Sequence, residues 1–402
     1  MPNTSRGGPL QGVRVLELTK VWAGPYAGKL LAFLGAEVIK VESNSNLDEM
    51  RAYGGVDINH APYFLSINSE ILSVQINMKT AEGLQLFRDM VAKSDIVINN
   101  IRPGAMERSG LGYEQLREIK RDIIAVSIKM FGNDGPLGHQ TGYAPCFAAL
   151  GGLNSLAGYE GGPPLGVNHR YGDSTVGAQA AYAAIVALMH RQRTGEGQFV
   201  DVSAVEGMSS MVGDSLFEQG LTGKSAVPDG NAHADMAPHG CYPCRDGTWL
   251  SIAVASDPEW HALCEGLDRA DLAKDSRFMT RAQRYEHRSG LDEQLSELTK
   301  EQDVDALANH LRALGVAAFK SQSSVNLIGD QYLWGRDFFR FVSDNKEGAR
   351  PILGAPWRMS KASASISRGA PDLGEHNAYV YREILGLSDE KLQELIGNRI
   401  VD

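Results

Sequence analysis

Apolar residues in the first third of the chain form short runs separated by turn residues, a pattern typical of alternating strands and helices. Val13–Leu18 is one short apolar run and Glu37–Val41 is another. Between them, Gly24-Pro25 marks a turn, and a leucine-rich segment with helical spacing follows it and ends at Gly35. A strand, a helix and a strand within about 30 residues predict a βαβ unit, and therefore a parallel sheet.

Later segments continue the alternation. The apolar runs Ile96–Ile98 and Ile123–Ile128 predict two more strands, and Thr80–Ala92 predicts a helix before them. The alanine-rich segment Gly172–Arg193 is the clearest helix, closed by Thr194-Gly195. The spacing over Asp201–Met211 predicts one more buried helix.

The length of 402 residues exceeds what one hydrophobic core usually serves, so we expect two domains. The predicted fold is α/β, with a Rossmann-like large domain built on a parallel sheet from residues 1–215 and completed by about 335–402. Residues 216–237 are expected to form a linker, because most of this stretch is polar and contains glycine. A smaller α+β domain is expected at 238–325, where a strand at Trp249–Val254 precedes a mostly helical stretch.

Composition and charge narrow the class of protein. Hydrophobic residues make up 43% and charged residues 22% of the chain, which is ordinary for a folded protein. The formal net charge of -10 argues against a nucleic-acid or membrane-surface binder. No run approaches the ~20 apolar residues that span a bilayer, and the first residues lack the apolar core of a signal peptide. We therefore expect a cytoplasmic protein with no membrane or nucleic-acid partner.

Several cofactor motifs are incomplete. The first βαβ turn has Gly24 and Gly28 but no G-x-G-x-x-G, and Gly24–Lys29 is one residue short of a P-loop, so NAD and ATP are not expected. Cys241-Tyr-Pro-Cys244 has no second C-x-x-C to complete a zinc site. Arg245–Gly247 follows it and predicts a hairpin turn. We expect packed cysteines, no metal and no permanently bound cofactor.

Seven short blocks, spread over most of the chain, together resemble the class III CoA-transferase family, which includes formyl-CoA:oxalate and carnitine CoA-transferases. Their order and spacing carry the resemblance. The blocks are Leu16–Pro25, Leu34–Glu42, Asn77–Gly83, Asn100–Gly104, Phe131–Pro136, Arg193–Gln198 and Gly374–Asn377. Within the family, the text from Trp22 to Ala81 is most similar to the subunits of succinyl-CoA:(R)-benzylsuccinate CoA-transferase, which belongs to toluene degradation.

The resemblance implies that Asp173 is the catalytic residue, in the sequence Tyr171-Gly172-Asp173. The implied reaction moves CoA from an acyl-CoA donor to a carboxylic acid acceptor through an aspartyl-CoA thioester, with CoA and acyl-CoA as substrates. From the residues alone, an aspartate before a helix is also a favoured N-cap. A carboxylate at that position is expected to stay ionised, since the helix dipole favours the anion.

The resemblance also implies where CoA is bound. The CoA contacts that it implies, with Arg102 added for its charge and its place between the blocks, are Val21, Ala23, Asn100, Arg102, Arg108 and Lys129. Aromatic side chains suit an acceptor pocket for an aryl-substituted succinate, although aromatic residues are also ordinary core residues. The candidates for this pocket are Tyr53, Tyr63, Phe131 and Tyr143.

Three positions differ from the family pattern. Ser43 stands where relatives often carry a basic residue, and Asn68–Ser73, which includes Glu70, lacks a lysine that the family's segment has. Val254–Asp257 replaces the glycine-rich loop of the oxalate enzyme. The family's architecture implies an interlocked homodimer, and the missing basic residues suggest a heterodimer whose paralogous subunit has the better CoA site.

Two other functions remain open. The first alternative is a non-catalytic or weakly CoA-binding subunit of a heteromeric CoA-transferase. The second alternative is a 2-methylacyl-CoA racemase, because racemases of this kind have the same fold. Racemases need a histidine that falls at Tyr143 in this chain, and His139 lies four residues earlier. The missing base argues against racemisation.

Overall fold

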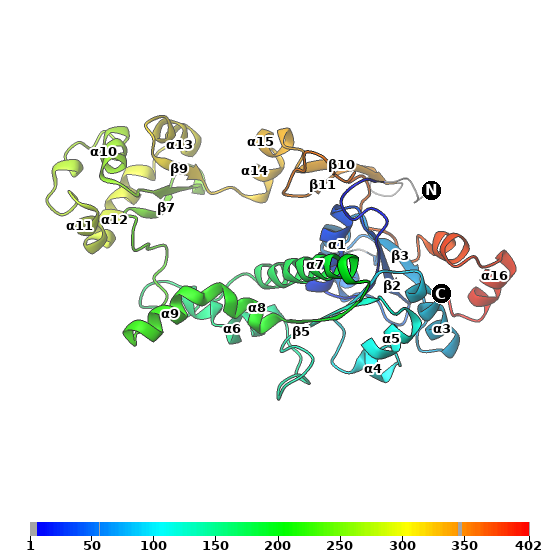
Figure 1. Cartoon of the computed structure of the whole chain (residues 1–402). Coiled ribbons are helices and arrows are strands. Elements are labelled where there is room, and N and C mark those ends of the chain that lie inside the picture. The colour runs from blue at the N-terminus through cyan, green and yellow to red at the C-terminus, as the bar shows by residue number, and fades with distance from the viewer. Residues whose placement is uncertain (1–5, 56, 345–347, 402) are drawn as a thin grey trace. The chain divides into compact units, whose positions relative to one another are not determined.

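A computed structural model describes residues 6–55, 57–344 and 348–401 (Figure 1). The chain divides into two compact units. The first comprises Met1–Ser155, Gly166–Ala226 and Gln331–Asp402, and the second comprises Leu156–Leu165 and Val227–Asp330. The second unit therefore includes ten residues from the first half of the chain, Leu156–Leu165. The hydrophobic pattern of the sequence does not predict that this segment belongs to the second unit.

A six-stranded parallel sheet in the order β3-β2-β1-β4-β5-β6 forms the centre of the first unit, which confirms the predicted Rossmann-like fold. Neighbouring strands in this sheet pair in parallel. β1 pairs with β2 on one side and with β4 on the other, so the strand order reverses there. The strands are β1 (Arg14–Leu18), β2 (Glu37–Glu42), β3 (Leu72–Gln75), β4 (Ile96–Asn99), β5 (Ile124–Lys129) and β6 (Phe199–Ser203).

Alternate residues of the central strands pack into two different cores, because successive side chains of a strand point to opposite faces. Ile124 and Val126 of β5 join α1 (Ala23–Phe33) and α7 (His169–Thr194) on one face. Ala125 joins the core that α3 (Ala81–Ala92) and α5 (Tyr113–Ile119) form on the other face. Helices therefore cover both faces, as Figure 1 shows, and the central strands are mostly apolar.

The rest of the first unit consists of short elements and the C-terminal segment. They are α2 (Pro62–Ile67), α4 (Ala105–Arg108), α6 (Ala144–Leu150), α8 (Ala204–Ser209), α9 (Gly213–Thr222), α15 (Gln331–Gly335), the antiparallel pair β10 (Phe339–Asp344) and β11 (Gly348–Leu353), a π-helix (Tyr379–Ile384) and α16 (Asp389–Gly397). No helix in the described part of the chain is both long and apolar enough to cross a membrane.

The motif Gly374–Asn377 binds the edge strand β3. The backbone N–H of Ser73 donates to His376 Nδ1 over 3.2 Å, and the N–H of Gln75 donates to Asn377 Oδ1 over 2.8 Å. The N–H of His376 in turn donates to the carbonyl oxygen of Ser73. These bonds occupy backbone groups that an edge strand otherwise leaves open for aggregation.

The structure corrects two predicted elements of this unit. The predicted helix at Asp201–Met211 begins as a strand: Asp201 belongs to β6, and α8 starts only at Ala204, where the Ser203 hydroxyl accepts from Glu206 N. A helix also occupies the first part of the stretch 216–237, which was predicted as a linker. Residues 213–222 form α9, so the extended segment begins after this helix.

The second unit is α+β, as predicted. Its antiparallel sheet contains β7 (His239–Pro243), β8 (Trp249–Ala253) and β9 (Ala317–Lys320), and Arg245–Gly247 makes the predicted turn between the first two strands. The helices of this unit are α10 (Asp257–Gly266), α11 (Arg281–Glu286), α12 (Arg288–Thr299), α13 (Val304–Ala313) and α14 (Ser324–Ile328). Cys244 and Cys264 are buried, the latter beside Trp260 in the core, whereas Cys241 is exposed.

Candidate active site

A cavity of about 510 Å³ opens at the carboxyl ends of β1, β4 and β5 in the first unit. Open parallel sheets bind ligands at this edge, beside the point where the strand order reverses. The loop after β1 contributes Lys20 and Val21, the loop after β4 contributes Asn100 and Arg102, and β5 ends in Lys129. The position of the cavity therefore follows from the topology of the sheet.

The cavity brings together the residues that the sequence singled out. Its lining includes all the predicted CoA contacts and the predicted nucleophile, namely Val21, Ala23, Asn100, Arg102, Arg108, Lys129 and Asp173. Of the four aromatic candidates, Tyr143 lines it and is 71% exposed. Tyr53, Tyr63 and Phe131 lie outside the lining.

Asp173 lies on the cavity wall inside α7, which corrects the expectation that it opens the helix. The helix starts at His169, and the side chain of Asn168 caps it by accepting from Arg170 N. The backbone N–H groups of the first turn, which lack intrahelical acceptors, therefore precede Asp173. Burial raises the pKa of the Asp173 carboxyl to about 7, whereas the N-cap interpretation predicted a stable anion. The carboxylate has no hydrogen bond or ion pair within the described residues.

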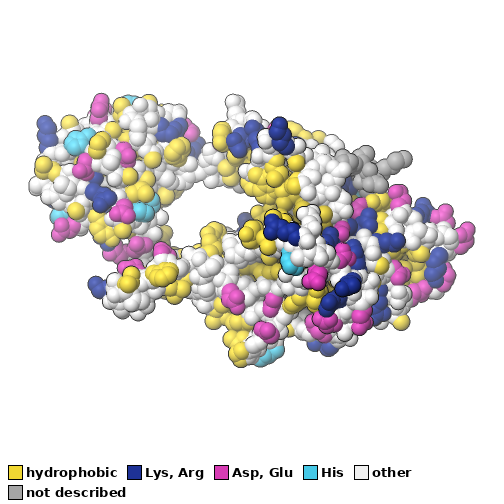
Figure 2. All heavy atoms as spheres, in the orientation of Figure 1, with side chains coloured by type: hydrophobic (Ala, Val, Ile, Leu, Met, Phe, Trp, Pro, Cys, Tyr) yellow, Lys and Arg dark blue, Asp and Glu magenta, His cyan; other side chains and the backbone are white. Residues whose placement is uncertain are grey.

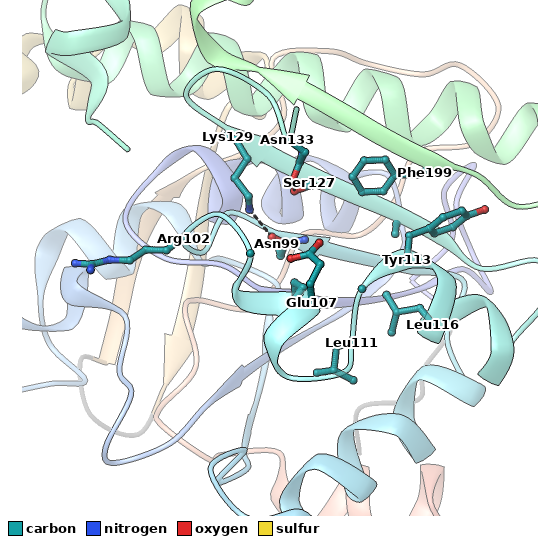
Figure 3. A pocket seen from close by; sticks show the side chains of 14 residues that line it. Asn99, Arg102, Glu107, Leu111, Tyr113, Leu116, Ser127, Lys129, Asn133 and Phe199 are labelled. Atoms are coloured by element: carbon teal, nitrogen blue, oxygen red, sulfur yellow. Dashed lines mark hydrogen bonds between the residues drawn. The ribbon is translucent and has the colours of Figure 1, made fainter. Parts of the chain in front are cut away.

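Lys129, the last residue of β5, supplies a buried cation to the same cavity. Its Nζ donates to Asn99 Oδ1 over 2.7 Å, and Figure 3 shows this bond together with Glu107 nearby. Burial lowers the pKa of Lys129 to about 8, while Glu107 and Asp201 act against this shift. The ammonium group therefore keeps most of its charge at pH 7. In the same view Arg102 points away from Lys129, so the two cations can contact different parts of one ligand.

Asn100 holds the loop after β1. Its side-chain oxygen accepts from Lys20 N over 2.8 Å, and its side-chain nitrogen donates to the Lys20 carbonyl oxygen over 2.7 Å. The next residue, Val21, has a φ of 65°, a strained value for a β-branched residue. Asp48 Oδ1 accepts from Val21 N over 2.8 Å and fixes this conformation. The implied CoA contact Asn100 is thus engaged by the backbone of the loop that lines the cavity.

A network of buried charged residues supports the loop after β1, because it includes the Asp48 carboxylate that binds Val21. Lys40 is fully buried, with its Nζ 3.2 Å from Glu17 Oε1 and 3.0 Å from Asp48 Oδ2. Burial by itself lowers the pKa of Lys40, but the carboxylates of Asp48 and Glu17 outweigh it and raise the pKa. Because a buried cation needs its partners, removing any of them is expected to unsettle the Asp48 carboxylate that holds Val21.

A second cavity of about 260 Å³ lies at the carboxyl ends of β1 and β2, next to the first. Lys20 and Asn46 line both cavities, and Lys79 and Ser43 line the second. Lys20 and Lys79 were not among the predicted site residues. The sequence could have indicated both lysines, since Lys20 precedes Val21 and Lys79 lies in the block Asn77–Gly83. Although Ser43 is not basic, these two lysines supply positive charge to the cavities.

Glu70, in the segment that lacks the family's lysine, anchors the C-terminal chain. It is fully buried and lies 2.9 Å from Arg6 Nη1 and 3.1 Å from Arg368 Nε. Its other oxygen accepts from the N–H groups of Ser367 and Arg368. Glu70 therefore has a structural role, since its carboxylate binds two arginines and two backbone N–H groups.

Three aromatic rings form a row beside α7. The Tyr53 and Tyr63 ring centroids are 6.4 Å apart, those of Tyr63 and Trp22 are 6.2 Å apart, and both pairs meet edge to face. Trp22 Nε1 donates to Ser174 Oγ over 3.0 Å, which ties the row to the helix turn that carries Asp173. Phe131 follows β5 and is half-buried.

Among the described residues, the lining of this cavity includes no histidine that could serve as the base of a racemase. Tyr143 lines the wall at the corresponding position, and His139 is exposed, with its Nε2 3.2 Å from the Gln140 side chain. His139 is not part of the lining.

Comparison with protein families decides the class of protein. A model of CoA-transferase family III matches residues 10–377 of the chain. The chain belongs to CoA-transferase family III. It is therefore a class III CoA-transferase, and its substrates are CoA thioesters.

Relatives in this family align over nearly the whole chain. Succinyl-CoA–D-citramalate CoA-transferase of Chloroflexus aurantiacus is 33% identical over 98% of this chain and 98% of its own. Succinyl-CoA:mesaconate CoA-transferase of Haloarcula marismortui is 34% identical over 94% and 96%. Among solved structures, a CAIB/BAIF family protein from Brucella suis is 33% identical, has a TM-score of 0.87, and aligns over 94% of this chain and 100% of its own.

Proposed function

We propose that this CoA-transferase moves CoA from succinyl-CoA to a second dicarboxylic acid through a covalent intermediate on Asp173. The observation that carries the proposal is a half-buried carboxylate, unpaired among the described residues, on the wall of a cavity that the cations Arg102, Arg108 and Lys129 also line. The donor is supported by the relatives, which use succinyl-CoA with citramalate, mesaconate or, in the human protein, glutarate.

In the first half-reaction the Asp173 carboxylate attacks the thioester carbonyl carbon of succinyl-CoA. The C–S bond breaks, CoA leaves as its thiolate, and Asp173 becomes a mixed anhydride with succinate. The thiolate then attacks the aspartyl carbonyl carbon of this anhydride. Succinate leaves, and Asp173 carries CoA as a thioester.

In the second half-reaction the acceptor carboxylate attacks the aspartyl thioester and releases the CoA thiolate. The thiolate attacks the acceptor's carbonyl carbon in the new anhydride, so the acceptor leaves as its CoA thioester and Asp173 returns as a carboxylate. One thioester is exchanged for another, so the proposed cycle needs no ATP. Its nucleophile is the anion, and the raised pKa makes this anion more basic than an exposed aspartate.

The bound CoA is proposed to lie along the sheet edge. Its phosphates need charge-assisted donors, and Lys20, Arg102, Arg108 and Lys129 provide four cations around the larger cavity. The adjoining cavity adds Lys79. The pantetheine arm then runs past Val21 and Ala23 towards Asp173.

The finer proposal for the acceptor is an aryl-substituted succinate. The exposed ring of Tyr143 on the cavity wall and the row Tyr53–Tyr63–Trp22 beside α7 support an aromatic substituent. The named relatives act on aliphatic dicarboxylic acids. Rates with benzylsuccinate, citramalate, mesaconate and glutarate, each with succinyl-CoA as donor, decide between the two acceptor classes. A rate with benzylsuccinate far below the aliphatic rates excludes the aryl proposal.

We also propose that the chain works as an interlocked dimer, with itself or with a paralogue. Large apolar side chains are exposed on α9, where Phe217 is 75% and Leu221 is 86% exposed, and on α7 at Tyr182. Figure 2 shows such side chains, in yellow, over α9 and over the β10–β11 segment. Contiguous exposed apolar surface marks a protein interface. A paralogous partner is supported by a relative that is an alpha subunit, that of succinyl-CoA–L-malate CoA-transferase.

The test of the covalent step uses hydroxylamine and mass spectrometry. The wild-type protein, purified alone and with any co-expressed paralogue, is incubated with succinyl-CoA and then with hydroxylamine. We expect a hydroxamate on Asp173 in the tryptic peptide that begins at Tyr171. Asp173→Asn should lose transfer and labelling, while Asp214→Asn on α9 should keep both. An active wild-type protein whose Asp173 peptide is never modified excludes the mechanism.

A further inference from the structure

Arg170 lies in the first turn of α7, three residues before Asp173. Residues three apart on a helix are neighbours on its surface, with about 5–6 Å between their Cβ atoms. Arg170 is exposed and is not part of the cavity lining. The proposed reaction gives it no role among the CoA contacts.

The aromatic row holds the guanidinium in place. It lies over the Tyr63 ring at 5.3 Å and over the Trp22 ring at 6.0 Å from their centroids. Its Nη2 donates to the Tyr63 hydroxyl over 3.3 Å. Since Trp22 is itself bonded to Ser174 on the next turn of α7, the cation is fixed relative to Asp173.

No carboxylate within the described ranges forms an ion pair with Arg170. A guanidinium carries five N–H donors in a planar fork that matches a carboxylate, and within the described residues Arg170 uses one of them, in the hydrogen bond to Tyr63. Arg170 is thus an immobilised cation with donors left for an anionic ligand, one helix turn from the reacting carboxyl.

We propose that Arg170 binds the distal carboxylate of the dicarboxylic substrates and so selects them over monocarboxylic acids. This inference rests on the proposed function and assigns its substrate class to one residue. In succinyl-CoA one carboxyl carbon is the thioester that Asp173 attacks, and the other end of the four-carbon chain is an anion. That anion needs a positive partner, and Arg170 lies three residues before Asp173 on α7, over the Trp22 ring that is bonded to Ser174.

One residue serves both half-reactions. Succinate leaves from the position that the acceptor later occupies, because both acids react with the same aspartyl carbonyl. Donor and acceptor therefore present their distal carboxylates to the same guanidinium in turn. Specificity for dicarboxylic acids is then equal in the two directions of the reaction.

The experiment compares two identity exchanges in the whole protein, with its partner where one is required: succinyl-CoA with labelled succinate, and butyryl-CoA with labelled butyrate. The two acyl groups have the same chain length, and only the first has a distal carboxylate. We expect Arg170→Gln to lower kcat/KM for the succinyl exchange by about 10- to 100-fold, as for the loss of a hydrogen bond to a charged group. The butyryl exchange should stay within about 3-fold of wild type.

Arg170→Lys keeps the charge but loses the fork, so its succinyl exchange should fall between wild type and Arg170→Gln. Arg193→Gln, an exposed arginine at the other end of the same helix, is the matched control and should change neither exchange. The inhibition constant of free succinate should rise in Arg170→Gln while that of butyrate does not. This second measurement applies even if the butyryl exchange is slow.

Equal losses in both exchanges, or an unchanged inhibition constant for succinate, would show that Arg170 only supports the helix and would overturn the inference. A succinyl exchange that Arg170→Gln leaves intact overturns it as well. Failure of the proposed function looks different: the wild type then exchanges neither pair, or Asp173→Asn remains active.

Discussion

Replacing Asp173 by asparagine removes a buried charge from the cavity wall while keeping the shape of the side chain. The carboxyl is half-buried in α7 and unpaired within the described residues, and burial raises its pKa from the ordinary 3.8 to about 7. An ionised Asp173 is therefore less stable in the folded protein than in the unfolded chain. We expect Asp173→Asn to abolish CoA transfer and to stabilise the fold at alkaline pH.

The sign and size of this effect follow from proton linkage. Between about pH 4 and pH 7 the folded protein binds more protons at Asp173 than the unfolded chain, so wild-type stability falls as the pH rises through that window. A shift of roughly three pKa units corresponds to about 4 kcal/mol at pH 8 and to less than about 2 kcal/mol at pH 5. The asparagine variant does not titrate, so its advantage over wild type shrinks on acidification.

Urea unfolding at pH 5 and pH 8, followed by circular dichroism, measures both differences in the free energy of unfolding. Asp214→Asn on α9 is the control and should change neither value by more than about 0.5 kcal/mol, as for a surface substitution. A destabilised Asp173→Asn protein, or a gain that is the same at both pH values, would refute the burial argument. It would also remove the reason for a basic nucleophile in the proposed mechanism.

Three further predictions concern the site and its support. The pH profile of kcat/KM should rise towards pH 7 as Asp173 ionises and fall above pH 8 as Lys129 loses its proton, and Lys129→Met should remove the alkaline limb while raising KM for acyl-CoA. Asn100→Ala removes both side-chain bonds to Lys20, so steady-state kinetics should show KM for acyl-CoA rising more than kcat falls. Glu70→Ala leaves two arginines without their buried partner, and urea unfolding should show a loss of about 3–5 kcal/mol, whereas an unchanged stability contradicts the anchoring role.

The sheet was predictable where the strands are rich in β-branched and other apolar residues. β1, β2, β4 and β5 each contain a group of such residues that pack against the helices on the two faces of the sheet. β3 and β6 escaped prediction for local reasons. β3 contains only two apolar residues, since Ser73 and Gln75 alternate with Leu72 and Val74. β6 contains Asp201, whose carboxylate accepts hydrogen bonds from the backbone and side-chain nitrogens of Asn133, so the strand tolerates a charge.

The site was predictable as a set of positions but not as a set of interactions. The family resemblance indicated most of the residues that meet at the cavity. Many of them follow strands of the parallel sheet, and the carboxyl ends of these strands lie at one edge. The resemblance could not reveal that Asn168 caps α7, because the cap and the aspartate are separated by a full turn of ordinary helix. It likewise gave no sign that Asn100 binds the backbone of Lys20 or that Arg170 rests on aromatic rings, since both depend on contacts between distant segments.

The placement of the cations explains how one site can keep a basic carboxylate and still bind anions. A salt bridge from Lys129 or Arg170 to Asp173 would lower the pKa of that carboxyl and weaken it as a nucleophile. In the structure Lys129 is bonded to Asn99, and Arg170 lies on the rings of Tyr63 and Trp22. Both positive charges are thus held by neutral groups, which leaves the pKa of Asp173 raised and the cations ready for the phosphates and carboxylates of the substrates. A variant that frees Arg170 from its rings, such as Tyr63→Ala, should therefore lower the pH at which activity rises.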